Sequence, residues 1–118
     1  DDDWKALEMH LGMSQDVANQ TGWRGTDEGT KLKSTSGWYS NGNGTDEVGF
    51  AAFPGGYRYA NYGSFDYMGY YALFWSASVS YTTPAWRRDL YYNYATVYRD
   101  AANRKYGFSV RLVKDYTP

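Results

Sequence analysis

Aromatic and arginine side chains gather between residues 81 and 105, and these residue types can recognise ligands without catalysing a reaction. Aromatic planes beside Arg and Asn suit sugar rings, through contacts of C–H groups with ring faces and hydrogen bonds to hydroxyls. They suit protein ligands equally well, because Tyr, Trp and Arg supply much of the binding energy at protein interfaces. The candidate ligand-binding residues are Tyr81, Trp86, Arg88, Tyr92, Tyr94, Tyr98, Arg99 and Asn103.

The same stretch has a second interpretation, as part of a hydrophobic core. In "AWRRDLYYNY" the even-numbered residues from Trp86 to Tyr92 share one face of an expected strand, and the odd-numbered residues share the other. We favour a core position for Trp86, Leu90 and Tyr92. Exposure is expected for the residues in turn-like surroundings, which are Tyr81, Tyr94, Arg99 and Asn103.

Two further arginines, Arg58 and Arg111, lie in strand-like phrases. A buried guanidinium must be paired, because an isolated charge in the core is very costly. Both are therefore interpreted as structural residues that bond loop carbonyls or an acid such as Asp66.

Catalytic and metal chemistry are not expected. The chain has no Cys and a single histidine, His10, near the end of an expected helix, where a cationic side chain is favourable. Its acids lie mostly in turns or beside basic residues, and no nucleophile-elbow phrase is present. The oxygen-rich turn lacks the spacing of an EF-hand loop, so we expect neither a metal nor a cofactor. That turn contains Asn41, Asn43, Thr45, Asp46 and Glu47.

Length and composition limit the remaining possibilities. The chain has 118 residues, enough for one domain, and its net charge of −1 argues against a general nucleic-acid binder. No apolar run reaches the roughly 18–20 residues that a membrane span needs. Aromatic residues make up 20% of the chain, with 14 Tyr, which is typical of recognition surfaces but also of Tyr-rich sheets.

Hydrophobic spacing predicts an α+β domain. Residues 3–11 are expected to form an amphipathic helix, with Trp4, Leu7 and Leu11 on one face, and a second short helix is expected from Ser14 to before Gly22. Residues 22–56 are expected to be long, irregular, Gly-rich chain. Strands are expected at residues 57–62, 70–78, 85–92, 96–100 and 108–114.

Several phrases resemble a known bacterial family. These are "DDDWKALEMHLGMS", "GWRGTDEGTKLKSTSGW", "GNGTDEVGFAAFPGGYR" and "YGFSVRLVKD". They are similar to the Fibrobacter succinogenes major paralogous domain, called FISUMP, from Trp4 to Asp115. The resemblance implies a C-type-lectin-like fold, with N-terminal helices, short twisted antiparallel strands and long Gly-rich loops. It also implies a secreted or cell-surface bacterial protein, often a lipoprotein, with a role in binding or adhesion. C-terminal sequences similar to the last of these phrases occur in the variable proteins of diversity-generating retroelements.

The chain departs from the family pattern in two ways. Family members usually carry a Cys where Leu112 stands, and usually have an upstream segment before the position of Asp1. The resemblance implies that the two ends of the domain pair as strands. We therefore expect the last strand, between Phe108 and Lys114, to lack its usual partner, and a separate fragment or a neighbouring chain to complete the sheet.

The sequence thus supports two functional hypotheses for one domain spanning residues 1–118. The first is a non-catalytic extracellular recognition domain that binds a glycan or a surface protein through residues 81–105. The alternative is a structural or assembly subunit of a cell-surface or phage-associated complex.

Overall fold

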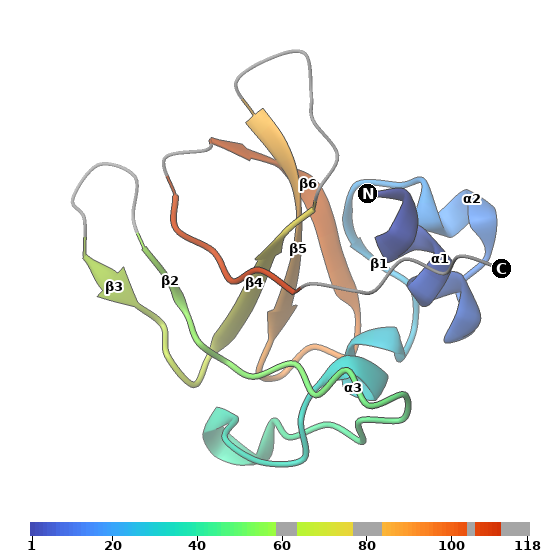
Figure 1. Ribbon diagram of the computed structural model, residues 1–118. Coiled ribbons are helices and arrows are strands. Elements are labelled where there is room, and N and C mark those ends of the chain that lie inside the picture. Colours follow the sequence, from blue (N-terminus) through green and yellow to red (C-terminus); the bar gives the residue numbers. More distant parts are fainter. Residues whose placement is uncertain (59–63, 77–83, 104–105, 112–118) are drawn as a thin grey trace, which may run out of the picture.

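A computed structural model describes residues 1–58, 64–76, 84–103 and 106–111. Its main element is a four-stranded antiparallel sheet with strand order β1-β6-β5-β4, beside a two-stranded sheet formed by β2 and β3 (Figure 1). The strands are β1 (Gly22–Arg24), β2 (Tyr57–Arg58), β3 (Phe65–Asp66), β4 (Tyr71–Trp75), β5 (Pro84–Tyr91) and β6 (Val97–Asn103). The helices are α1 (Asp2–His10), α2 (Gln15–Ala18), α3 (Glu28–Leu32) and a single 3₁₀ turn, η1 (Tyr39–Asn41).

Helix α1 packs on the sheet through the apolar face that its sequence predicts. Trp4 and Leu7 pack against the core, and Leu11, just after the helix, is buried in it. The Trp4 ring lies 5.6 Å from the Phe74 ring of β4. The predicted amphipathic helix is therefore confirmed. The buried core cluster consists of Leu11, Leu32, Trp38, Ala52, Ala72, Phe74, Leu90 and Val97.

The four-stranded sheet has two faces of different chemistry, because side chains alternate along each strand. On the inner face, which α1 covers, Arg88 of β5 lies opposite Arg99 of β6 and Phe74 of β4. On the outer face, Asp89 of β5 lies opposite Tyr98 of β6.

The predicted elements are confirmed in outline and corrected in detail. The two N-terminal helices are present, and the Ser14 hydroxyl caps the second by accepting from the Val17 N–H at 3.2 Å. The stretch 22–56 is less irregular than expected, since it contains β1, α3 and η1. The strands expected at 57–62 and 70–78 are shorter within the described residues, at Tyr57–Arg58 and Tyr71–Trp75. No helix in the described part of the chain is long and apolar enough to cross a membrane.

The expected last strand is not a regular strand over its described residues. Ser109 forms an isolated parallel bridge with Phe74, and its N–H donates to the Leu73 carbonyl at 2.9 Å. Gly107 bridges Arg58 instead. Leu112 to Lys114 lie outside the described residues, so the neighbouring chain proposed for this edge stays a prediction.

Candidate binding face

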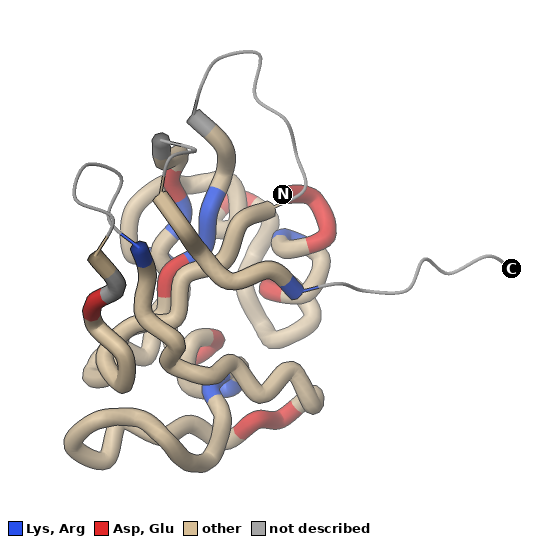
Figure 2. The backbone as a smooth tube through the Cα atoms, turned by 60° about the vertical axis from the view of Figure 1, so that its left-hand side comes forward, with Lys and Arg blue, Asp and Glu red and all other residues tan. Residues whose placement is uncertain are grey.

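Two of the candidate ligand-binding residues, Arg88 and Arg99, are buried in an ion-pair network on the inner face. Arg88 Nη1 lies 2.7 Å from Asp1 Oδ1, and Arg99 Nη2 lies 2.8 Å from Asp1 Oδ2. Arg99 Nη1 also donates to the Asn19 carbonyl oxygen at 2.9 Å. Figure 2 shows the acidic positions of the N-terminal helix beside the basic positions of the strands. The predicted exposure of Arg99 is therefore wrong, and neither guanidinium faces solvent, because α1 covers this side of the sheet.

Glu8 joins the same network to a third arginine. Its side chain is fully buried and accepts two hydrogen bonds from Arg24, at 2.6 and 2.8 Å. It also accepts from Arg88 Nε, at 3.1 and 3.2 Å. Burial lowers the pKa of the Arg88 guanidinium, and the charge of Glu8 opposes that shift. The structural arginines are thus Arg24, Arg88 and Arg99, whereas Arg58 and Arg111, which we expected to be structural, have exposed side chains.

The remaining candidate residues are divided between the core and the surface. Trp86 is half-buried under the Arg99 guanidinium, 4.0 Å from its ring centre, and Tyr92 is half-buried against Tyr70. Tyr94 is 44% exposed, which confirms its predicted exposure. Tyr98 is half-buried on the outer face. Tyr81 and the side chain of Asn103 lie outside the described residues.

The outer face carries a continuous row of side chains across all four strands. Trp23 of β1 lies opposite Tyr98 of β6, Tyr98 opposite Asp89 of β5, and Asp89 opposite Leu73 of β4. One step along the sheet, Tyr91 lies opposite Tyr71. Residues of β2 and of the segment after β6 lie over the middle of this row, where Leu73 and Asp89 are buried, whereas Trp23 at one end is 37% exposed.

Aromatic rings on this side contact one another from one edge of the sheet to the other. The Trp23 ring lies 4.7 Å from Tyr94, Tyr94 lies 5.3 Å from Tyr91, and Tyr91 lies 4.4 Å from Tyr71. Tyr57 of β2 continues the series, 6.1 Å from Tyr71. We call the set Trp23, Tyr57, Tyr71, Tyr91, Tyr94 and Tyr98 the aromatic face. Such rings present a broad, rigid surface for stacking.

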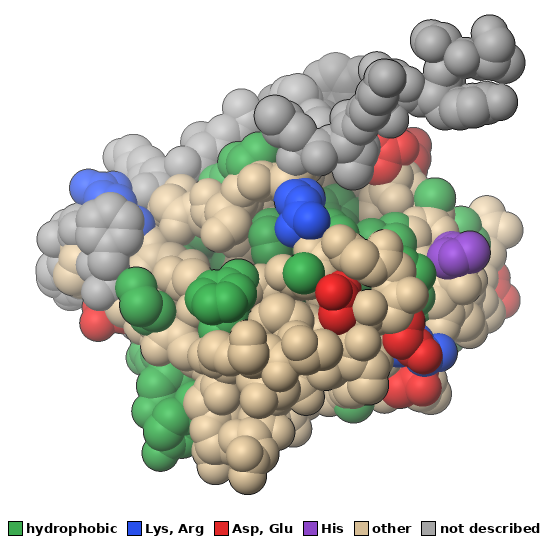
Figure 3. Space-filling view, turned by 60° about the horizontal axis from the view of Figure 1, so that its bottom comes forward, with side chains coloured by type: hydrophobic (Ala, Val, Ile, Leu, Met, Phe, Trp, Pro, Cys, Tyr) green, Lys and Arg blue, Asp and Glu red, His purple; other side chains and the backbone are tan. Residues whose placement is uncertain are grey.

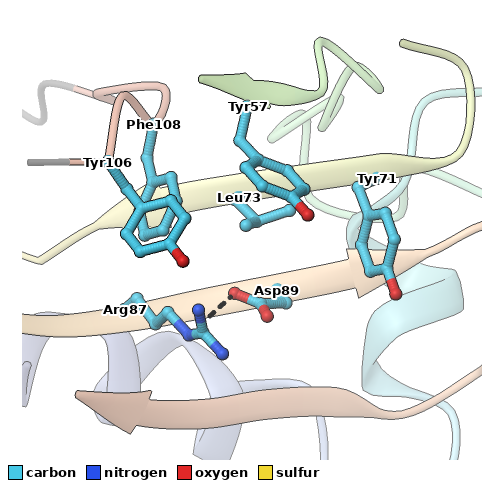
Figure 4. A pocket seen from close by; sticks show the side chains of 7 residues that line it. All are labelled: Tyr57, Tyr71, Leu73, Arg87, Asp89, Tyr106 and Phe108. Carbon is cyan, nitrogen blue, oxygen red and sulfur yellow. Dashed lines mark ion pairs between the residues drawn. The ribbon is translucent and has the colours of Figure 1, made fainter. Parts of the chain in front are cut away.

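A pocket of about 160 Å³ opens within the aromatic face. Its floor is formed by β4 and β5, which supply Leu73, Arg87 and Asp89, and its walls by residues from β2 and from the segment after β6 (Figure 4). The ring of Phe108 packs 4.3 Å from Trp75 and fixes that second wall. The lining residues are Tyr57, Tyr71, Leu73, Arg87, Asp89, Tyr106 and Phe108.

The polar pair in the pocket is incompletely bonded. Arg87 Nε lies 3.5 Å from Asp89 Oδ1, a weak ion pair, and within the described residues neither atom has a hydrogen-bond partner. The Arg87 guanidinium instead lies over the Tyr98 ring, 4.9 Å from its centre. Burial raises the pKa of Asp89 to about 7, while the charge of Arg87 opposes the rise and that of Asp100 adds to it. Unpaired buried polar atoms of this kind are costly to a fold and need an explanation.

The raised pKa makes the stability of the protein depend on pH through Asp89. The carboxyl group titrates near its ordinary value of 3.8 in the unfolded chain and near 7 in the folded one, so folding disfavours its ionised form. The loss of folding stability caused by Asp89 therefore grows as pH rises from about 4 to 7. An Asp89→Asn variant cannot ionise. We compare the unfolding free energy of the variant with that of wild type at each pH. This difference should favour the variant by on the order of 2 kcal/mol more at pH 8 than at pH 5.

Urea unfolding of both proteins at the two pH values measures this difference. Asp16→Asn, at an exposed position in α2, is the matched control and should show no such change. An equal effect of Asp89→Asn at pH 5 and pH 8 would contradict the prediction.

Comparison with known families identifies the chain. A family model described as the Fibrobacter succinogenes major domain matches residues 1–114. The chain belongs to this family. A search of the curated proteins and one of the solved structures returned no significant match.

In the oxygen-rich turn of this Fibrobacter succinogenes major domain, side-chain oxygens accept hydrogen bonds from nearby backbone N–H groups. Asn43 Oδ1 accepts from the Trp38 N–H at 3.0 Å, and Asp46 Oδ1 accepts from the Ala51 N–H at 2.7 Å. Among the described residues, no group of three or more His, Cys, Asp or Glu side chains could hold a metal ion. His10, at the end of α1, is exposed (Figure 3).

Sequence reasoning missed most residues of the aromatic face of this Fibrobacter succinogenes major domain. The alternation of "AWRRDLYYNY" correctly separates Arg87, Asp89 and Tyr91 from the inner residues. The core position favoured for Leu90 and Tyr92 is confirmed, since Leu90 is buried in the core cluster and Tyr92 packs against it. Trp23 was missed because its strand has only three residues.

Proposed function

We propose that this protein is a non-catalytic extracellular recognition domain that binds a glycan or a surface protein through its aromatic face. The observation that carries the proposal is the open series of contacting rings from Trp23 to Tyr57, with an incompletely bonded Arg–Asp pair at its centre. Rigid aromatic area around a few polar groups is the usual composition of a recognition site. The proposed surface keeps Tyr94 and Tyr98 from the residues expected by sequence, whereas Arg88 and Arg99 stabilise the fold instead.

We further propose that the fold is C-type-lectin-like and that the protein acts at the bacterial cell surface. Short N-terminal helices against a small antiparallel sheet, with long loops between them, support that fold. The cell-surface location and a lipoprotein form rest on the family resemblance alone. In such an arrangement the sheet supplies a rigid base, and the residues that it displays determine what is bound.

The proposal predicts that two exposed rings of the aromatic face are needed for binding. Trp23 and Tyr94 are 37% and 44% exposed and contact each other edge to face. We expect a Trp23→Ala/Tyr94→Ala double variant to lose at least about tenfold in affinity for its ligand, because aromatic anchors in an interface each contribute roughly 1 kcal/mol or more. Hits are first collected with wild type on a broad glycan array and by pull-down from a bacterial surface extract.

A matched control separates this effect from a general loss of surface aromatics. Phe53 is 62% exposed, and its ring packs beside Gly37, so Phe53→Ala should bind like wild type. Equal binding by wild type and the double variant would overturn the proposal. Concentration-dependent self-association without any captured ligand would favour the alternative, an assembly subunit.

A further inference from the structure

We propose that the pocket at Arg87 and Asp89 is a subsite for one neutral sugar ring of a glycan ligand. This inference rests on the proposed recognition function and names the chemistry that its central pocket accepts. Arg87 and Asp89 lie within the stretch 81–105 but are not among the candidate ligand-binding residues named from the sequence.

The size of the pocket sets the size of its ligand group. A cavity of about 150 Å³ accommodates a benzene-sized molecule. The pocket here, at about 160 Å³, therefore holds a single ring and not a chain of several. It opens toward the aromatic face, so further units of a longer ligand would lie on the rings of Tyr91, Tyr94 and Trp23.

The polar atoms of the pocket form a donor and an acceptor side by side. Asp89 has a side chain only 8% exposed, and its Oδ1 has no hydrogen-bond partner within the described residues. Arg87 Nε is likewise without one, 3.5 Å from that oxygen. Neighbouring hydroxyls of a sugar match this arrangement, because one hydroxyl donates to the carboxylate and the next accepts from the guanidinium N–H.

The charges in and near the pocket disfavour ionic ligand groups. A cation placed against Asp89 would also meet the guanidinium of Arg87. An anion placed against Arg87 would meet Asp89 and the charge of Asp100, which lies opposite Arg87 on β6. A neutral group with several hydroxyls bonds both side chains without an uncompensated charge.

The walls of the pocket supply the apolar contact that the C–H face of a sugar needs. Tyr57 and Tyr71 line it from β2 and β4, with ring centres 6.1 Å apart and nearly perpendicular planes. Phe108 and Tyr106 line it from the segment after β6. The side chains enter the same hollow from separate elements (Figure 4), so the site depends on the fold as a whole.

The subsite should respond to pH, since a sugar hydroxyl donates best to an ionised Asp89. Burial raises the pKa of that group to about 7, so affinity should fall about tenfold between pH 8 and pH 6 if only the carboxylate binds. The titratable or charged groups that face Asp89 or lie beside it are Arg87 on its own strand, Tyr98 and Asp100 on β6, Tyr57 on β2, Tyr71 on β4 and Tyr106. A His10→Gln background removes the one side chain that ordinarily titrates near neutral pH.

The test is a titration of the whole protein with a panel of neutral monosaccharides, followed by protein NMR. The panel includes hexoses, a pentose and an N-acetylhexosamine, with an alkylammonium salt, an acetate salt and a simple amide as comparison probes. We expect a neutral sugar to bind wild type, and Asp89→Asn or Arg87→Gln to weaken that binding at least tenfold. Asp16→Asn should leave it unchanged.

Each outcome decides the proposal. Sugar binding that Asp89→Asn leaves intact, or preferential binding of the ammonium, acetate or amide probe, would overturn it. Failure of every sugar to bind, while the array or pull-down still yields a ligand that depends on Trp23 and Tyr94, would overturn the subsite and keep the recognition function. Failure of all three assays would remove both. Because Asp89→Asn and Arg87→Gln alter the pocket differently, loss of folding in one variant leaves the other to decide.

Discussion

Glu8→Gln is expected to be the most damaging of the substitutions considered for this protein, lowering the free energy of unfolding by about 3–5 kcal/mol. The Glu8 carboxylate is fully buried and bonds the guanidinium groups of both Arg24 and Arg88. Glutamine keeps the shape but removes the charge, and its NH₂ group cannot accept from either arginine. Arg24 would then have no acidic partner among the described residues, and Arg88 would keep only Asp1, whose carboxylate also pairs with Arg99. Such a loss is a large share of the roughly 5–15 kcal/mol by which a domain is stable.

Thermal and urea unfolding measure the effect, with Glu47→Gln as the control. Glu47 is exposed, and that substitution should change stability by less than about 0.5 kcal/mol. We expect the melting temperature of Glu8→Gln to fall by roughly 10 °C or more. A variant as stable as wild type would show that the inner arginines do not need this carboxylate.

Gly56→Ala is expected to have the second largest effect, about 3 kcal/mol of lost stability. Gly56 has φ of +69°, a left-handed conformation that costs a residue with a Cβ atom energy. An added Cβ would also overlap the carbonyl oxygen of Asp66 on β3. The backbone would have to shift where Gly56 N–H donates to the Tyr71 carbonyl at 2.8 Å. Tyr57, the next residue, would then move out of the pocket wall.

Gly22→Ala separates the backbone strain from the steric overlap. Gly22 has φ of +84°, but no heavy atom lies within 4 Å of the added Cβ position. Its replacement should cost about 1 kcal/mol, from conformation alone. Urea unfolding of the two variants side by side should show the difference. A similar loss of unfolding free energy in both variants would mean that β3 shifts at little cost to make room for a side chain at position 56.

The sequence predicted local structure well where a short periodic pattern determined it. Trp4, Leu7 and Leu11 predicted the buried face of α1, and the alternation from Trp86 to Tyr92 predicted which residues of β5 lie together. Both patterns depend only on the geometry of a helix or a strand. Strands of two or three residues, such as β1 and β3, have too few positions to form a pattern and were not predicted.

The candidate binding face could not be predicted because it depends on long-range packing. Arg88 and Arg99 have the residue type of a recognition site, and their bonds to Glu8 and Asp1, 80 and 98 positions earlier in the chain, make them structural. The pocket likewise joins residues from β2, β4, β5 and the segment after β6. No local rule brings Tyr57 and Asp89 together, so the site follows from the topology and not from the composition.

The acid–arginine network also constrains when the protein can fold. Glu8 is separated from Arg88 by 80 positions, and Asp1 from Arg99 by 98. At a synthesis rate of about 5–20 residues per second, Arg88 is added to the chain roughly 4–16 s after Glu8. During that time the acids and apolar face of the first helix have no sheet to pack on. The native contacts of this network therefore form only after β5 and β6 have been made, and a ribosome-bound chain that stops before β5 is expected to remain unfolded.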